Sequence, residues 1–131
     1  MARSRTLLIL LALLASALFA GCTTPASPPH EVTVTTEDLR FQAPATVEAG
    51  WNTITLDNQG DDLHHLQLIQ LADGKEVEDL FAEMSPAGVP PSWASEYGGP
   101  NAAMPGSSSR ATVWLDPGTY VLADFIPDRN G

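Results

Sequence analysis

The chain has 131 residues, with 16 acidic and only 6 basic side chains, and its formal net charge is −10. A protein this acidic lacks the basic surface that nucleic-acid binding requires, so we exclude that class of function. The charge is compatible with cations, basic partners or a salty habitat. The single cysteine excludes an intramolecular disulfide.

The first 21 residues predict an export signal and no part of a folded domain. Arg3 and Arg5 precede an unbroken apolar run over residues 7–19, and small residues follow it up to Cys22. The run is too short to span a bilayer comfortably, and this order of basic, apolar and small residues is typical of a cleaved signal peptide. Such a signal peptide can end at a cysteine that becomes lipidated. The alternative is an ordinary signal peptide, in which Cys22 is incidental.

The Gly21-Cys22 junction resembles a bacterial lipobox, although Phe19 stands where leucine is more usual. The resemblance implies cleavage before Cys22 and lipidation of its sulfur, which would hold the protein on a membrane without crossing it. We therefore expect an exported bacterial lipoprotein, anchored on the periplasmic or extracellular side of a membrane. Residues 22–30 would be the lipidated cysteine and a flexible tether rich in proline, serine and threonine.

Residues 31–131 predict one all-β domain. Alternating runs rich in β-branched side chains predict strands over residues 31–41, 43–60 (two strands around a turn at Ala49-Gly50), 64–71, 110–115 and 119–125. Apolar side chains at helical spacing predict one short inserted helix over 76–84, followed by a long loop over 85–109. Six or seven short strands and one helix predict an antiparallel Greek-key sandwich or barrel.

The stretch LDPGTY, residues 115–120, supports the same fold class. A turn followed by a tyrosine that opens a strand is similar to the tyrosine corner of Greek-key sandwiches, in which the hydroxyl bonds back to nearby backbone. The alternative is a β-turn beside a half-buried tyrosine. Neither interpretation indicates a function.

Three stretches of the domain resemble the cupredoxins, the plastocyanin and azurin family of blue-copper sandwiches. Residues 49–68 resemble the strand, turn and first histidine ligand of that family, with Asn58 ahead of His64 by the family's interval. Residues 104–115 resemble the loop and strand that follow, and residues 115–125 resemble the strand that ends in the family's cysteine ligand. The resemblance covers nearly the whole predicted domain and implies a cupredoxin-like fold more firmly than an activity.

Two adjacent histidines open the strand predicted over residues 64–71. His64 shares a face with Leu66 and Leu68, so we expect it to point towards the core and the end of the sandwich. His65 shares the other face with Gln67 and is expected to face water. We predict His64 as a metal ligand and His65 as its outer neighbour; the alternative is a histidine pair that binds nothing.

The chain departs from the resemblance at the position of the copper-binding cysteine, which is Asp124 here, four residues past Tyr120. A blue-copper centre requires a thiolate, and lipidation would consume that of Cys22, so we expect no blue-copper centre. Asp124 could pair with protonated His64, ligate zinc, non-blue copper or a similar ion beside it, or reach solvent where the strand ends. Met104 could be an axial ligand, although a loop methionine is more often a gap-filler.

The predicted domain also lacks the further histidine and the final strand that the cupredoxins have after this point. A missing strand would remove buried side chains and leave an exposed edge that pairs readily with another chain. One hypothesis is that the domain is C-terminally incomplete at Gly131. The other is that a protein partner supplies a strand by edge addition.

The sequence therefore predicts an exported, lipid-anchored, cupredoxin-like binding protein of the cell envelope that binds a metal weakly through His64. One alternative is a copper-binding electron-transfer or copper-handling protein whose remaining ligands lie beyond residue 131. Another is a structural interaction domain with no metal. We do not expect an enzyme, because the sequence has no nucleophile elbow, no recognisable Ser/His/Asp set and no phosphate-binding glycine loop.

Overall fold

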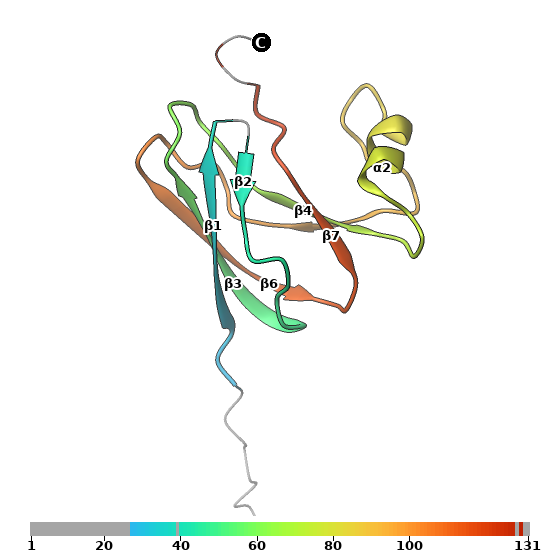
Figure 1. The fold of residues 1–131 in the computed structure, drawn as a ribbon, viewed down its shortest axis with the longest axis horizontal. Coiled ribbons are helices and arrows are strands. Elements are labelled where there is room, and N and C mark those ends of the chain that lie inside the picture. The colour runs from blue at the N-terminus through green and yellow to red at the C-terminus, as the bar shows by residue number, and fades with distance from the viewer. Residues whose placement is uncertain (1–26, 39, 128, 130–131) are drawn as a thin grey trace, which may run out of the picture.

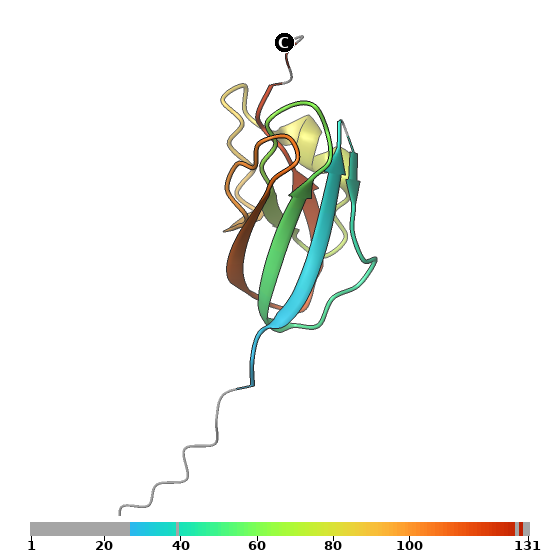
Figure 2. The same ribbon diagram turned by 90° about the vertical axis from the view of Figure 1, so that its left-hand side faces the viewer.

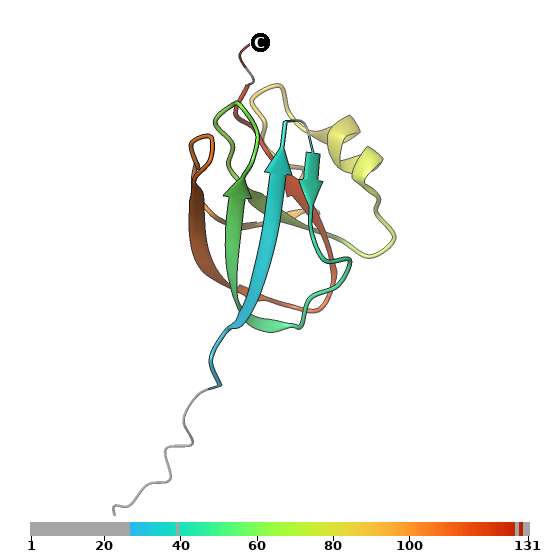
Figure 3. The same cartoon turned by 60° about the vertical axis from the view of Figure 1, so that its left-hand side comes forward.

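The computed structural model describes residues 27–38, 40–127 and 129, and this part of the chain has seven strands and one short helix. The strands form two sheets that pack face to face as a β-sandwich (Figure 1, Figure 3). The elements are β1 His30–Glu37, β2 Arg40–Gln42, β3 Gly50–Asn58, β4 Gln67–Leu71, α2 Val77–Glu83, β5 Ser95–Gly98, β6 Ser108–Leu115 and β7 Thr119–Ala123. One sheet has the order β2-β1-β3-β6 and the other β5-β4-β7. The predicted all-β class and the inserted helix are confirmed.

The N-terminal strands differ from the sequence prediction. The run over residues 31–41 is two strands, β1 and β2, because the chain turns at Asp38, whose φ of 53° lies in the left-handed region. The short strand expected at the start of residues 43–60 is absent, and residues 43–49 form an exposed connection. Among the described residues, no strand pairs with residues 43–49, so their alternating side chains do not form part of a sheet.

Two later parts of the chain also differ from the sequence prediction. β4 begins at Gln67, because His64 makes only an isolated bridge with Ala103 before the regular ladder starts. The loop predicted over residues 85–109 contains β5, which pairs with β4 across a register shift between Leu68 and Ile69. A four-residue strand in a segment rich in proline and glycine carries too little alternation to be predicted.

The pairing of β1 with β3 is parallel, in register from His30 opposite Asn52 to Thr36 opposite Asn58. The other strand pairs are antiparallel. The expectation of a wholly antiparallel sandwich was therefore wrong for this pair. Alternation along one strand determines which side chains face the core but says nothing about the direction of the neighbouring strand.

Both faces of the three-stranded sheet are covered. Its inner face packs on the other sheet around the buried residues Val34, Ile54, Leu56, Leu66, Leu68, Ala103 and Leu115. Its outer face packs against α2, where Ile69, Leu71, Leu80 and Ala123 form a second cluster (Figure 1). Burial of each large aliphatic side chain stabilises the fold by about 1.5–3 kcal/mol.

Different segments of the chain lie at the two ends of the sandwich. β1 and β3 both end, and β6 begins, at what we call the upper pole, the end of the sandwich that carries residues 58–64 and 103–107. The described chain enters at the opposite, lower pole, where β1 starts (Figure 2). Within the described residues, no helix has the length and apolar character that crossing a membrane requires.

Candidate functional site at the upper pole

Asn58, fully buried at the end of β3, holds the upper pole together. Its Nδ2 donates to the carbonyl oxygens of Asp62, at 2.7 Å, and Ala103, at 2.8 Å. Its Oδ1 accepts the backbone N–H of Gly60 at 2.9 Å. These bonds fasten the turn after β3 to the loop before β6. His64 leaves this turn and exchanges two backbone hydrogen bonds with Ala103.

His64 and Asp124 form a close pair at this pole. His64 is only 4% exposed, and its Nδ1 lies 2.7 Å from Oδ2 of Asp124. Asp124 directly follows β7, and its side chain is 17% exposed. A carboxylate only accepts hydrogen bonds, so Nδ1 of His64 carries the shared proton. Of the three roles expected for Asp124, pairing with His64 is the arrangement that this structure has, and β7 does end before it.

The other ring nitrogen of His64, Nε2, is buried without a hydrogen-bond partner among the described residues. It lies against Gly60, where an added Cβ would come 3.4 Å from Nε2 and 2.8 Å from the backbone nitrogen of Asp38. A metal ion on Nδ1 would shift the proton to Nε2. Metal-bound histidines normally donate that second N–H to an acceptor, so its lack here would weaken any metal binding.

His65 approaches the same carboxylate from its other side. Its Nε2 lies 3.4 Å from Oδ1 of Asp124 and accepts the backbone N–H of Phe125 at 2.8 Å. The backbone N–H of Ile126 also donates to Oδ1 of Asp124, at 2.9 Å. The two oxygens of Asp124 therefore face one imidazole each. The side chain of His65 is 25% exposed, so the expectation that it faces water holds only in part.

A pocket of about 280 Å³ opens beside this pair, between the β1–β2 turn, the end of β7 and α2. Asp38, Arg40 and Phe81 line it together with His64 and Asp124. The pocket therefore gives a small solute a route to an acid and a histidine that are otherwise nearly covered.

Arg129 closes the turn next to the pole. Its Nε donates to Oδ1 of Asp62 at 2.7 Å, and its Nη2 donates to the carbonyl oxygen of Asp61 at 2.6 Å. The Asp62 carboxylate raises the pKa of Arg129 above its ordinary value. Asp61 and Asp62, in the turn after β3, therefore contact the chain that follows β7.

Met104 is apart from the other predicted site residues. It is 64% exposed, its carbonyl oxygen accepts the backbone N–H of Ser107, and it does not line the pocket. Cys22, the predicted lipidation site, lies outside the described residues.

The cluster of His64, His65 and Asp124 offers two imidazoles and one carboxylate as donors, and among the described residues it has no thiolate beside it. That set does not fit a blue-copper centre, whereas zinc and non-blue copper accept nitrogen and oxygen ligands. In the part of the chain that the structure describes, no three His, Cys, Asp or Glu side chains already form a group that could hold a metal ion. His65 in particular would have to release the Phe125 N–H before it could ligate.

Sequence reasoning missed two contributors to this site. The close approach of Gly60 to Nε2 of His64 depends on the fold of a turn whose only local sign is the spacing Asn58-x-Gly60. The bond from the Phe125 N–H to His65 joins residues 60 apart in sequence, and no local pattern indicates it.

No family model matches the chain, and neither the curated proteins nor the solved structures give a match. The resemblance to the cupredoxins therefore remains a prediction from residues 49–68, 104–115 and 115–125. What supports a proposal for the function of this site is the geometry of the upper pole.

Proposed function

We propose that this chain is an exported, lipid-anchored binding protein of the cell envelope whose upper pole binds a divalent transition-metal ion weakly. The observation that supports it is the Asp124 carboxylate, 2.7 Å from Nδ1 of His64 and 3.4 Å from Nε2 of His65. Tetrahedral metal sites with bonds of about 2.0–2.2 Å set neighbouring ligand atoms roughly 3.3 Å apart. His65 is already at such a separation, and His64 would withdraw by about half an ångström.

The same proposal includes a cupredoxin-like Greek-key topology. The tyrosine corner supports it, because the hydroxyl of Tyr120 donates to the carbonyl oxygen of Asp116 at 2.9 Å, four residues upstream. In that topology His64 and Asp124 would stand at the positions of the family's first histidine and its cysteine. The replacement of sulfur by oxygen is why we propose binding and not electron transfer.

The position of the pole suits a site that faces away from a membrane. The described chain enters at the lower pole, and β3, which runs from one pole to the other, has nine residues and spans about 30 Å. A lipid at Cys22 would therefore leave His64 directed away from the lipid surface. Soluble ions or partners would reach the site without displacing the anchor.

Calorimetry with Zn²⁺ and Cu²⁺ on the full chain in detergent tests this proposal. We expect a dissociation constant in the micromolar range for at least one ion, and a loss of at least tenfold in both His64→Ala and Asp124→Asn. The matched control is His30→Ala, because His30 is exposed at the start of β1, at the lower pole. The metal site is excluded if neither ion gives heat, or if His30→Ala weakens binding as much as His64→Ala does.

A second candidate is an interaction domain with no metal, in which His64 and Asp124 only lock the end of β7 to the turn before β4. Among the described residues Nε2 of His64 has no hydrogen-bond partner, and this favours the second candidate because a metal-bound histidine needs an acceptor for its second N–H. Under this candidate Asp124→Asn lowers the denaturation midpoint, and neither metal ion raises the midpoint of the wild type.

A further inference from the structure

The sandwich has one closed side and one open side. On the closed side β5 lies against β6. On the open side β7 faces β2 and the connection over residues 43–49. Within the described residues β7 pairs with β4 alone, so the backbone groups on its other edge have no ladder partner there.

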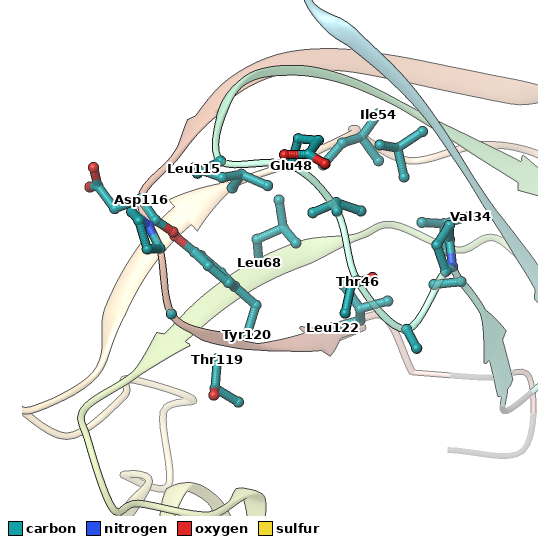
Figure 4. Close-up of a pocket in the computed structure, with 18 residues that line it drawn as sticks. Val34, Thr46, Glu48, Ile54, Leu68, Leu115, Asp116, Thr119, Tyr120 and Leu122 are labelled. Carbon is teal, nitrogen blue, oxygen red and sulfur yellow. The ribbon is translucent and has the colours of Figure 1, made fainter.

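Two pockets follow this free edge and share Leu122. One has a volume of about 470 Å³ and lies between Val34 of β1 and Tyr120 of β7 (Figure 4). The other is the pocket of about 280 Å³ described above, which continues past Phe41 of β2 to Phe125. We call the two together the β7 groove. It borders residues 119–125, a length of about 20 Å, which is that of an ordinary strand.

The β7 groove presents apolar side chains and lacks the features that usually protect a sheet edge. Phe81, Val47 and Phe125 border it and are 57%, 43% and 39% exposed. β7 itself reads TYVLA, without charge or proline, and its pairing with β4 has no bulge. Edges that avoid association usually carry such a charge, proline or bulge.

The charges that line the groove identify the chemistry of its occupant. Glu48 and Asp116 line one end, Asp38 and Asp124 line the other, and Arg40 is the one Lys or Arg among the described lining residues. A second copy of this chain also carries a net charge of −10 and would be repelled. A basic partner is attracted to these acids.

We propose that the β7 groove binds an extended, basic segment of another protein as an additional strand beside β7. Backbone hydrogen bonds to β7 would supply a sequence-independent part of the affinity. Alternate side chains would enter the space lined by Val34 and Leu122 and must be apolar, whereas Lys or Arg at the ends would meet the acids of the groove. This inference does not require a bound metal, but one end of the groove reaches His64 and Asp124, so the test is made in EDTA.

The probe is a fluorescent peptide that alternates valine and threonine and has two lysines at each end. Fluorescence anisotropy with the full chain in detergent and EDTA is expected to give a dissociation constant of tens of micromolar. N-methylation of alternate backbone amides should weaken binding at least tenfold, because it removes the donors of the ladder without changing the protein. Replacing the lysines by glutamates should weaken it at least fivefold. Equal binding of the N-methylated peptide would overturn the proposal.

A charge reversal at the rim provides the matched test on the protein. Glu48 is exposed and only its backbone oxygen is used, by Asn52, so Glu48→Lys leaves the fold intact. It should weaken the lysine peptide at least threefold and strengthen the glutamate peptide. Glu78→Lys, at an exposed position of α2 that does not line the groove, should change neither. No difference between the two variants contradicts the proposal, as does a homodimer that the peptide cannot displace in sedimentation experiments.

Discussion

At the scale of single residues, Asp116 shows how one acid joins three strands. Its carboxylate accepts the hydroxyl of Tyr97 at 2.8 Å and Nε1–H of Trp114 at 3.0 Å, and its carbonyl oxygen accepts the hydroxyl of Tyr120. The bonds from Tyr97 and Trp114 lower the pKa of Asp116, and the same bond to Asp116 raises the pKa of Tyr97. Tyr97 of β5 and Trp114 of β6 therefore meet at the side chain of Asp116, and Tyr120 of β7 meets them at its backbone.

The lowered pKa of Asp116 predicts a loss of stability in acid. Its contribution is fully present above the ordinary value of 3.8 and is lost as the pH falls below that value, through the lowered pKa. Asp116→Asn should therefore have a lower urea midpoint than the wild type at neutral pH, and the two should approach each other as the pH falls below 3.8. Circular dichroism measures both midpoints. Asp73→Asn, in an exposed turn, is the control; a similar change there would show that the effect is not specific to Asp116.

The candidate site shows what single residues reveal to sequence reasoning. The alternation of His64 with Leu66 and Leu68 correctly predicted its burial, because neighbours two apart share a face of an extended chain. The position of Asp124 beside His64 was only one of three expectations. The two residues are 60 apart in sequence, and they meet because β4 and β7 pair in one sheet with Gln67 opposite Ala123.

At the scale of elements, α2 is the clearest success of a local pattern and also shows its limit. Val77, Leu80, Phe81 and Met84 have helical spacing, and the helix forms where they predict it. Leu80 is completely buried, whereas Phe81 is 57% exposed. Spacing identifies the apolar stripe of a helix, but the surface opposite decides which of its residues are covered.

The contrast between Leu80 and Phe81 gives a matched pair of mutations. Leu80→Ala removes a fully buried side chain from the cluster of Ile69 and Leu71, and should lower the free energy of unfolding by about 2–5 kcal/mol. Phe81→Ala should change it by less than about 0.5 kcal/mol, because that ring remains largely in water. Urea titrations monitored by circular dichroism give both values. Equal effects would mean that α2 does not pack on the sheet through Leu80.

At the scale of the whole molecule, three tasks are proposed for three regions. They are membrane anchoring below the lower pole, metal binding at the upper pole and binding of a strand on the open side. The described chain enters at the lower pole (Figure 1). The His64–Asp124 pair lies at the upper pole, and the β7 groove follows β7 up to that pair. The net charge of −10 is consistent with a cation at the pole and a basic segment in the groove. Anchoring at Cys22 would leave both accessible.

The predicted anchor has a direct test. Cys22→Ser removes the sulfur that lipidation requires, so the exported protein should move from the membrane fraction to the soluble fraction. Immunoblotting of the separated fractions measures the shift. Thr24→Ser, two residues further along the tether, should remain with the membrane. If the Cys22→Ser protein also stays in the membrane fraction, the lipoprotein prediction is wrong.

The sequence by itself determined the local elements: the all-β class, the inserted helix, the strands at 50–58 and 110–115, and the tyrosine that opens β7. Each follows from side-chain periodicity or turn chemistry within a few residues, and such patterns act through neighbours along the chain. The tertiary structure alone decided the parallel pairing of β1 with β3, the His64–Asp124 pair and the groove beside β7. These arise where segments distant in sequence meet, and periodicity specifies which face is buried but not which segment covers it.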